Sequence, residues 1–329
     1  MNQTWLICTS INHPTESIKT FSQISDDNKN FRILVVGDKK TPADYRYKNV
    51  IYLSTAQQLQ LFPELSKLIP FNHYSRKNLG YLYAIKNGAD IIFDTDDDNI
   101  PYGNFNLNVD QKITSEVVGN SKWINIYAYF TEKLIWPRGL PLNYIHQKGE
   151  YITNSIVDSP IQQYLADLDP DVDAIYRLLN KEEITFNKLV KPISILPDSF
   201  VPFNSQNTIF FKVLFPLLYL PCFVSFRMTD IWRSFVAQKI MWKYNYCLSF
   251  HSATLFQKRN EHDLMKDFKE EIDGYCRNEE IADKLLGFQL KPNDDIYTDL
   301  YVCWDLLRQI NIITDLEIKI IEKWLEEIR

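Results

Sequence analysis

The sequence is poor in glycine and lacks an excess of positive charge. Nine glycines occur in 329 residues, and no Gly/Ser-rich stretch, internal repeat or low-complexity block is present. Because flexible linkers are built from such stretches, we expect closely packed parts without a long tether. The formal net charge is −6 at pH 7. A protein without a basic field is a poor match for a phosphate backbone, so nucleic acid is not an expected partner.

Cysteine is also scarce, and none of it is arranged in pairs. The five cysteines do not form a CxxC or a Cys/His cluster. This pattern favours reduced thiols in a cytosolic setting and argues against a zinc site. The N-terminal sequence MNQTWLICTSI has no basic start followed by an apolar core, so we do not interpret it as a signal peptide.

A long, uninterrupted apolar run is missing as well. The most apolar stretch, residues 208–226, contains Lys212, Pro216 and Pro221. It is short for a bilayer span and is better interpreted as buried core. We therefore expect a cytoplasmic protein without a transmembrane segment. Peripheral association with the inner face of a membrane remains open, and so does the oligomeric state.

What is present is an alternation of strand and helix patterns over the first third of the chain. Apolar runs at 4–11, 31–38 and 49–54 and the segment ADIIFDTDDD at 89–98 predict strands, and amphipathic patterns between them, such as 75–88, predict helices. This order indicates an α/β fold with a parallel sheet covered by helices. Short strands such as 122–130 are predicted next, and the chain beyond 229 is mainly helical. We expect a first domain over residues 1–256 and a helical extension over 257–329 packed against it.

One segment, IIFDTDDDNIP at 91–101, poses a chemical problem. Asp94, Asp96, Asp97 and Asp98 crowd behind three apolar residues. Side chains alternate along a strand, so Asp94, Asp96 and Asp98 share a direction if the extended geometry persists. The carboxyl end of a parallel strand is where open α/β sheets bind ligands. A divalent ion such as Mg²⁺ or Mn²⁺ makes such crowding favourable and leaves positions for phosphate oxygens. The alternatives are a solvated acidic turn or a calcium-type loop.

The same segment carries a family resemblance. FDTDDDNIP looks like the DxD region of GT-A glycosyltransferases, and residues 76–99 are similar to the STELLO family. The reversibly glycosylated polypeptides, a UDP-arabinopyranose mutase family, are more distantly similar. Four further segments support the resemblance: VVGDKKTP (35–42), WPRGLPLNYI (136–145), LADLDPDVDAIYRL (165–178) and FRMTDIWRSFVAQKI (226–240).

The resemblance implies a Rossmann-like GT-A domain and a metal-dependent glycosyltransferase. Its donor would be a nucleotide-diphosphate sugar, with UDP expected, its cofactor Mn²⁺ or Mg²⁺, and its acceptor a glycan or glycolipid. The composition, rich in Asn, Lys and Ile, separately suggests a microbial protein that acts in surface-polysaccharide synthesis. Two alternatives stay open: a nucleotide-sugar mutase or self-glycosylating protein, and a non-catalytic partner of other glycosyltransferases.

The resemblance also suggests roles for particular residues. Asp230 would be the base that activates the acceptor, and Asp96, Asp98 and His251 would hold the metal. The expected donor-binding residues are Thr9, Asp38, Arg76, Asn78, Asp96, Asp97, Arg138, Asp171 and Asp173. Ordinary structural roles compete with each assignment. Asp38 and Asp230 could cap a turn or a helix, and an acid of the run Asp169, Asp171 and Asp173 could cap the helix that follows it. Arg138 could be a turn residue, and His251 could be an ordinary buried or surface histidine.

Overall fold

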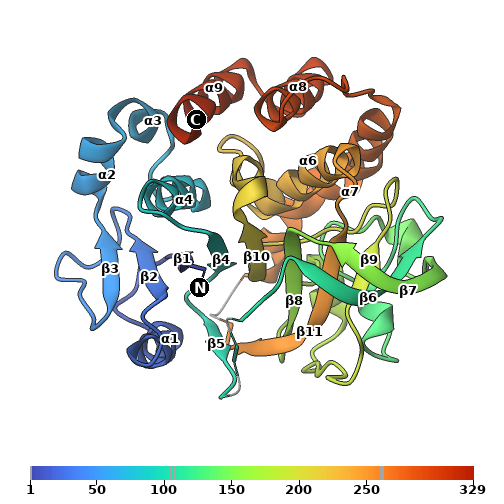
Figure 1. Cartoon of the computed structure of the whole chain (residues 1–329), viewed down its shortest axis with the longest axis horizontal. Helices are drawn as coiled ribbons and strands as arrows, with labels where there is room; N and C mark the ends of the chain where they lie inside the picture. The colour runs from blue at the N-terminus through green and yellow to red at the C-terminus, as the bar shows by residue number, and fades with distance from the viewer. Residues whose placement is uncertain (1, 104, 107, 260–262) are drawn as a thin grey trace.

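A computed structural model describes residues 2–103, 105–106, 108–259 and 263–329 of the chain (Figure 1). Its strands form a mixed sheet in the order β3-β2-β1-β4-β10-β8-β11-β9-β6-β7, with β5 paired to β11. At one end β3, β2, β1 and β4 are all parallel. The α/β class with a Rossmann-like N-terminal part, as predicted, is confirmed.

The N-terminal part alternates as the sequence pattern indicates. Its elements are β1 (Thr4–Thr9), α1 (Glu16–Asp26), β2 (Phe31–Val36), β3 (Val50–Leu53), α2 (Thr55–Leu61), α3 (Pro63–Leu68), α4 (Lys77–Lys86) and β4 (Ile91–Thr95), with the 3-10 helix η1 (Tyr74–Arg76) before α4. Alternate residues of β1 enter two different cores. Ile7 packs in the larger core on the α4 side, and Leu6 packs with Phe21 of α1 on the other side. Figure 1 shows α1 and α4 on opposite faces of this part of the sheet.

The middle of the chain supplies the other strands: β5 (Asn99–Pro101), β6 (Lys112–Gly119), β7 (Glu150–Asp158), β8 (Ile161–Asp167), β9 (Ile193–Ile195), β10 (Asn207–Phe211) and β11 (Leu248–Gln257), with α5 (Ala174–Leu179) after β8. The strand predicted at 122–130 is wrong. Trp123 makes an isolated bridge to Phe200, and the 3-10 helix η2 (Ile126–Tyr129) follows. These residues are apolar because they are buried in the larger core, not because they alternate in a strand.

The C-terminal part is helical, with α6 (Thr229–Lys243), α7 (Leu264–Gly287), α8 (Ile296–Gln309) and α9 (Asp315–Ile328). The last helix returns to the N-terminal part, where it contacts α3 and α4 (Figure 1). Glu317 of α9 is buried and accepts hydrogen bonds from the backbone N–H groups of Cys222 (2.8 Å) and Phe223 (2.7 Å). The helical part thus fixes the loop that leads to the 3-10 helix η5 (Phe226–Met228). The predicted domain boundary at 256 stays a prediction.

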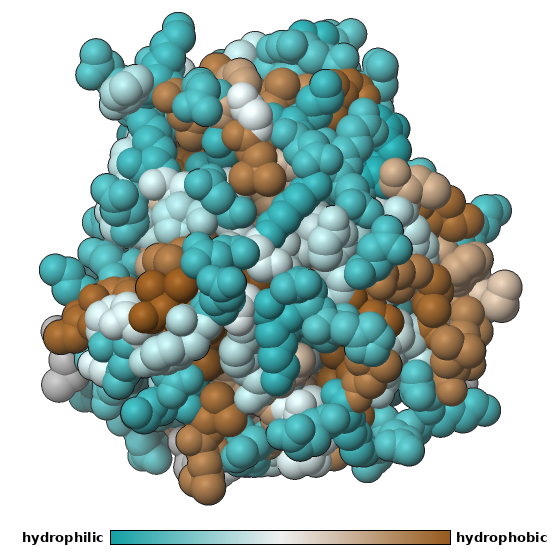
Figure 2. Space-filling model, turned by 90° about the vertical axis from the view of Figure 1, so that its right-hand side faces the viewer, coloured by the Kyte–Doolittle hydropathy of each residue, from teal (hydrophilic) through white to brown (hydrophobic). Residues whose placement is uncertain are grey.

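The apolar stretch at 208–226 divides between β10, the 3-10 helix η4 (Lys212–Leu218) and the following loop. Leu214, Leu217, Leu218 and Leu220 are all buried, as expected for core. No helix in the described part of the chain has the length and apolar character needed to cross a bilayer. Figure 2 shows hydrophilic and hydrophobic patches interspersed over the face that carries β6, β7 and α7.

Candidate active site

A cavity of about 640 Å³ opens at the carboxyl ends of β1, β2 and β4. Its wall includes nine of the predicted residues: Thr9, Asp38, Arg76, Asp96, Asp97, Asp98, Arg138, Asp171 and Asp230. The strand ends come together because parallel strands point the same way, and this edge is the usual ligand site of open α/β sheets. Segments far apart in the sequence therefore meet in one polar cavity.

Asp94 differs from the acids that follow it, because it lies beneath the cavity in a buried ion cluster. Its carboxylate pairs with Lys77 at 2.7 Å and with Arg233 of α6 at 3.0 Å, and all three side chains are essentially inaccessible. A carboxylate already neutralised by two cations does not need a metal. The expectation that Asp94 acts together with Asp96 and Asp98 is therefore not met.

Asp96 and Asp97 sit at the cavity wall with protein partners. Asp96 accepts a hydrogen bond from the Tyr74 hydroxyl at 2.7 Å and lies 3.2 Å from the Lys77 ammonium. Its side chain remains 32% exposed, so it can accept a further ligand. Asp97 accepts hydrogen bonds from the side chains of Ser10 and Asn12. It thereby ties the end of β1 to the acidic loop.

Asp98 is the least satisfied acid of the loop. One carboxylate oxygen accepts a hydrogen bond from Gln257 at 3.0 Å, and the other is buried without a partner among the described residues. Burial, followed by the neighbouring charge of Asp96, raises the pKa of Asp98 to about 7. A buried carboxylate oxygen without a donor is destabilised, and a cation would relieve this cost.

These observations fit a divalent ion held by few protein ligands. No group of three or more His, Cys, Asp or Glu side chains converges as a metal cage within the described residues. Mg²⁺ needs no such cage, because one or two carboxylates and substrate phosphates suffice. Asp96 and Asp98 could provide those carboxylates, and the Asp98 oxygen without a partner among the described residues is the position that a cation could fill.

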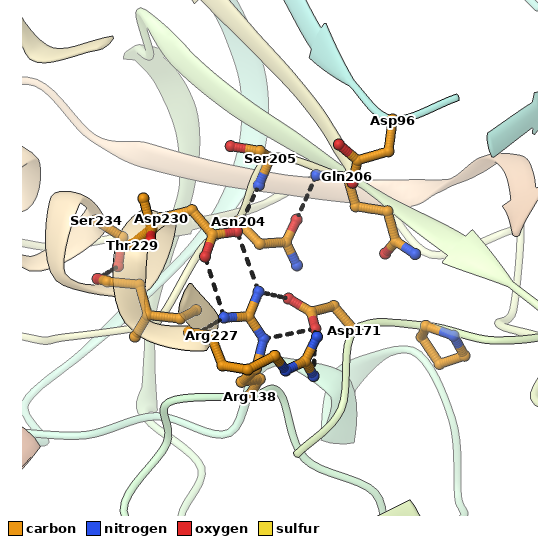
Figure 3. A network of polar contacts seen from close by, with 12 residues as sticks. Asp96, Arg138, Asp171, Asn204, Ser205, Gln206, Arg227, Thr229, Asp230 and Ser234 are labelled. Carbon is orange, nitrogen blue, oxygen red and sulfur yellow. Dashed lines mark hydrogen bonds and ion pairs between the residues drawn. The ribbon is translucent and has the colours of Figure 1, made fainter. Parts of the chain in front are cut away.

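A second polar centre surrounds Arg138 (Figure 3). Its guanidinium donates to both oxygens of Asp171, at 2.8 and 2.7 Å, and to both oxygens of Asp230, at 3.0 and 3.1 Å. Burial opposes its charge, but Asp171 and Asp230 together raise the pKa of Arg138. Asp230 also accepts the backbone N–H of Ser205 at 3.1 Å. It lies in the first turn of α6, where the helix dipole stabilises a negative charge.

Two donor-binding candidates line the cavity with structural partners of their own. Asp38 accepts hydrogen bonds from the backbone N–H groups of Lys39 (2.7 Å) and His73 (3.3 Å). Arg76 is fully buried and donates to Gln58 at 2.7 Å and to the carbonyl of Ile69 at 3.0 Å, so it joins η1 to α2 and α3.

Three predicted residues are not among the residues that line the cavity. Asn78 exchanges hydrogen bonds with the backbone of Leu220, at 2.8 and 2.9 Å. Asp173 caps α5 and accepts the Trp136 indole N–H at 2.7 Å.

His251 stacks on Tyr164 with ring centroids 4.3 Å apart, and burial lowers its pKa to about 4. His251 precedes Gln257 on β11 by six positions, or about 20 Å of extended strand.

Several residues of the site had no distinctive sequence signal. Tyr74 bonds to Asp96, and Gln257 connects Asp98 to Gln206 at 2.9 Å. Arg227 faces the cavity three residues before Asp230. Tyrosine and glutamine are common in many settings, so only the folded chain identifies them. Only Arg227 could have been suspected from the sequence, because it lies three positions before Asp230, the predicted base.

Comparison with known proteins agrees with the family resemblance. Residues 227–329 match the family model described as STELLO glycosyltransferases. Over 345 residues the chain is 27% identical to the "Probable glycosyltransferase STELLO2" of Arabidopsis thaliana and 26% identical to "Probable glycosyltransferase STELLO1" of the same plant. Each alignment covers 98% of this chain and 44% of the relative, so the chain spans less than half the length of the curated relatives it matches.

Proposed function

We propose that this chain, a relative of the STELLO glycosyltransferases, is a metal-dependent GT-A glycosyltransferase that moves a sugar from a nucleotide-diphosphate donor, most simply a UDP-sugar, to a glycan hydroxyl. The observation that carries the proposal is the shared cavity. It brings together two acids at the carboxyl ends of parallel strands. Asp98 has one carboxylate oxygen without a partner among the described residues, and Asp230 lies in the first turn of α6.

The nucleoside would lie over the ends of β1 and β2. Thr9, Ser10 and Asp38 line that part of the cavity with hydroxyl and carboxylate oxygens that can accept from a base N–H or ribose hydroxyls. His73 and Phe226 lie beside them with ring centroids 5.8 Å apart, which provides an aromatic wall. From there the diphosphate would extend towards Asp96 and Asp98.

Asp96 and Asp98 would hold the cation. A bound Mg²⁺ or Mn²⁺ supplies Lewis-acid neutralisation of the diphosphate leaving group. The protein itself orients these acids. Tyr74 and Lys77 fix Asp96, and Gln257 fixes Asp98. Lys77, whose ammonium lies 3.2 Å from Asp96, also contributes positive charge near the proposed cation position.

Asp230 would take the proton from the acceptor hydroxyl as its oxygen attacks the anomeric carbon. The new bond forms between acceptor oxygen and C1, the bond from C1 to the diphosphate breaks, and the proton passes to Asp230. Each carboxylate oxygen has two lone-pair directions. Oδ2 accepts from both Arg138 and the Ser205 N–H, and Oδ1 accepts from Arg138, which leaves Oδ1 room for one more donor. Arg138 holds the base in one orientation, as general base catalysis requires. We propose surface-polysaccharide synthesis in the cytoplasm as the setting, on the sequence expectation alone.

Thermal-shift measurements with UDP and Mn²⁺ test this proposal. The expected result is a stabilisation that requires both, because a ligand that binds the folded state raises the melting temperature through linkage. Asp96→Ala combined with Asp98→Ala should abolish the shift. Asp273→Asn, an exposed acid on α7, should preserve it.

Turnover separates the alternatives. Release of UDP from a UDP-sugar in the presence of an acceptor supports transfer, and covalent labelling of the chain would favour a self-glycosylating protein. Equal thermal shifts with and without the cation would contradict the metal assignment. Failure to bind any sugar nucleotide would favour a non-catalytic partner.

A further inference from the structure

A second cavity, of about 770 Å³, adjoins the first. Arg177, Gln257 and Arg259 line both cavities, so the two share a wall. Gln257 is also the hydrogen-bond partner of Asp98. The second cavity therefore begins directly beside the proposed cation position and extends along the segment between β8 and α5. Tyr176, Phe256 and Leu264 give it an apolar and aromatic lining.

Three arginines cluster near the wall that the cavities share. Arg177 and Arg259 line both cavities, and Arg227 lines the first. They come from α5, η5 and the segment after β11, and their side chains are only 12%, 13% and 11% exposed. Such deep burial of three guanidinium groups is costly unless negative charge surrounds them.

Each of the three arginines has a close acidic partner, and Arg227 also lies 3.9 Å from Asp171, which pairs with Arg138. Arg177 pairs with Asp169, Arg227 with Glu271 at 2.9 Å, and Arg259 with Asp267 at 2.7 Å.

These pairings leave donors for a ligand. The Nε of Arg177 is buried without a hydrogen-bond partner among the described residues. Arg259 bonds to Asp267 through Nη2, and guanidinium has five N–H donors in a planar fork. The arginines also repel one another. Burial, then the charges of Arg177 and Arg227, lower the pKa of Arg259 to about 10. An anion at this wall could accept hydrogen bonds from donors that have no partner among the described residues, and its charge would offset the repulsion between the arginines.

The cluster lies on the Asp230 side of the site. Arg227 precedes Asp230 by one helical turn, and its carbonyl accepts a hydrogen bond from Arg138, the partner of Asp230 (Figure 3). The proposed nucleoside contacts, Thr9 and Asp38, come from different elements, the carboxyl ends of β1 and β2. A group at the arginine wall is thus beside the proposed base, where the attacking hydroxyl must enter.

We propose that the second cavity holds the acceptor, and that Arg177 and Arg259 bind an anionic substituent of it, a carboxylate of an acidic sugar or a phosphate on the glycan. This assignment rests on the proposed function and names its acceptor class. Bidentate donors of fixed geometry suit both oxyanions. The aromatic lining provides faces for the neighbouring sugar rings.

Isothermal titration of the full chain with defined probes tests the assignment. Trigalacturonate represents the carboxylate source, galactose 6-phosphate the phosphate source, and galactotriose the neutral control. We expect one of the two anionic probes to bind at least tenfold more tightly than galactotriose, with the preferred probe identifying the source. Arg177→Gln and Arg259→Gln should each weaken that binding at least tenfold. Lys284→Gln, which removes an exposed positive charge on α7, should not change it.

The outcomes separate this proposal from the donor assignment. Variants that lose the anionic probe but keep the UDP and Mn²⁺ thermal shift support an acceptor site. If the variants lose UDP binding to the same extent, or if pyrophosphate displaces the anionic probe, the cluster serves the donor diphosphate and the proposal is overturned. Equal binding of anionic and neutral probes also overturns it. Loss of UDP binding in the Asp96/Asp98 double variant is independent of all three results.

Discussion

Arg138 donates to both carboxylate oxygens of Asp230, at 3.0 and 3.1 Å, so the acid proposed as the base is held face to face with a buried guanidinium. This contact joins a turn before β7 to the first turn of α6. A base held in this way keeps its position before the acceptor arrives. It also depends on its partner, and the consequences for activity and for stability can be measured separately.

Asp230→Asn should reduce kcat by about 10²- to 10⁴-fold, the usual contribution of a positioned general base. The amide keeps an oxygen for Arg138 or for the Ser205 N–H but cannot take a proton. Steady-state kinetics should show the loss in kcat, while the UDP affinity measured by titration stays unchanged. The exposed Asp273→Asn is the matched control. A purely structural role would instead lower the melting temperature and the UDP affinity, with little specific effect on kcat.

We predict that Arg138 does not become glycosylated when the protein meets a sugar nucleotide. Its side chain is 6% exposed and is held by Asp171 and Asp230, whose charges raise its pKa against the effect of burial. A charged, buried guanidinium is a poor nucleophile. Intact-mass measurement after incubation with UDP-sugars and Mn²⁺ should show no added sugar. A mass increase that disappears in Arg138→Lys would contradict this expectation and favour the self-glycosylating alternative.

Asp98 predicts a pH dependence. Its pKa is raised from 3.8 to about 7, so the folded state holds this proton more tightly than the unfolded chain does. Its contribution to folding stability should therefore fall as pH rises from about 4 to about 7. Cation binding requires the ionised form, so the Mn²⁺ affinity should rise by about tenfold per pH unit up to about 7 and then level off.

Titration of Mn²⁺ at pH 5.5, 6.5 and 7.5 measures this slope. Asp98→Asn should bind the ion weakly and without the same dependence on pH. Asp273→Asn should behave as the unmodified chain. A Mn²⁺ affinity that does not change between pH 5.5 and 7.5 would rule out Asp98 as a ligand with a raised pKa.

The comparison of sequence with structure separates local patterns from long-range contacts. The apolar runs that form β1, β2 and β4 predicted the parallel strands whose carboxyl ends border the cavity, because the pattern of a strand is local in the sequence. The acids after β4 likewise marked the cavity. The partners of Asp94 could not be predicted. One of them, Arg233 of α6, lies 139 positions away in the sequence, and only the folded chain brings it to within 3.0 Å of Asp94.

The prediction for His251 was also limited by information that only the folded chain contains. His251 follows an apolar run late in the α/β part, as a metal ligand would, but its depth along β11 depends on register. The pairing of Gln257 with Asn99 brings Gln257, and not His251, to the acidic loop. The segment around Asp173 was also ambiguous. Of the neighbouring acids, Asp171 faces Arg138 in the cavity, and Asp173 caps α5.

Lys77 should be a major determinant of stability. Its ammonium is inaccessible and lies 2.7 Å from Asp94 and 3.2 Å from Asp96. Lys77→Met removes the charge at similar volume and leaves Asp94 with Arg233 as its remaining cation. Loss of one partner of a buried pair costs about 3–5 kcal/mol. Lys86→Met, on the same helix, removes a partly exposed pair with Glu327 and should cost about 1 kcal/mol or less.

Urea unfolding monitored by circular dichroism measures both changes in the free energy of unfolding. A double-mutant cycle with Asp94→Asn then isolates the pair. If the ion pair is the cause, the double variant should be less destabilised than the sum of the two single variants, because the second change removes the uncompensated carboxylate. Additive losses, or a Lys77→Met variant within 1 kcal/mol of the unmodified chain, would mean that Arg233 alone neutralises Asp94. The stability of the buried ion cluster next to the proposed cation site would then not depend on Lys77.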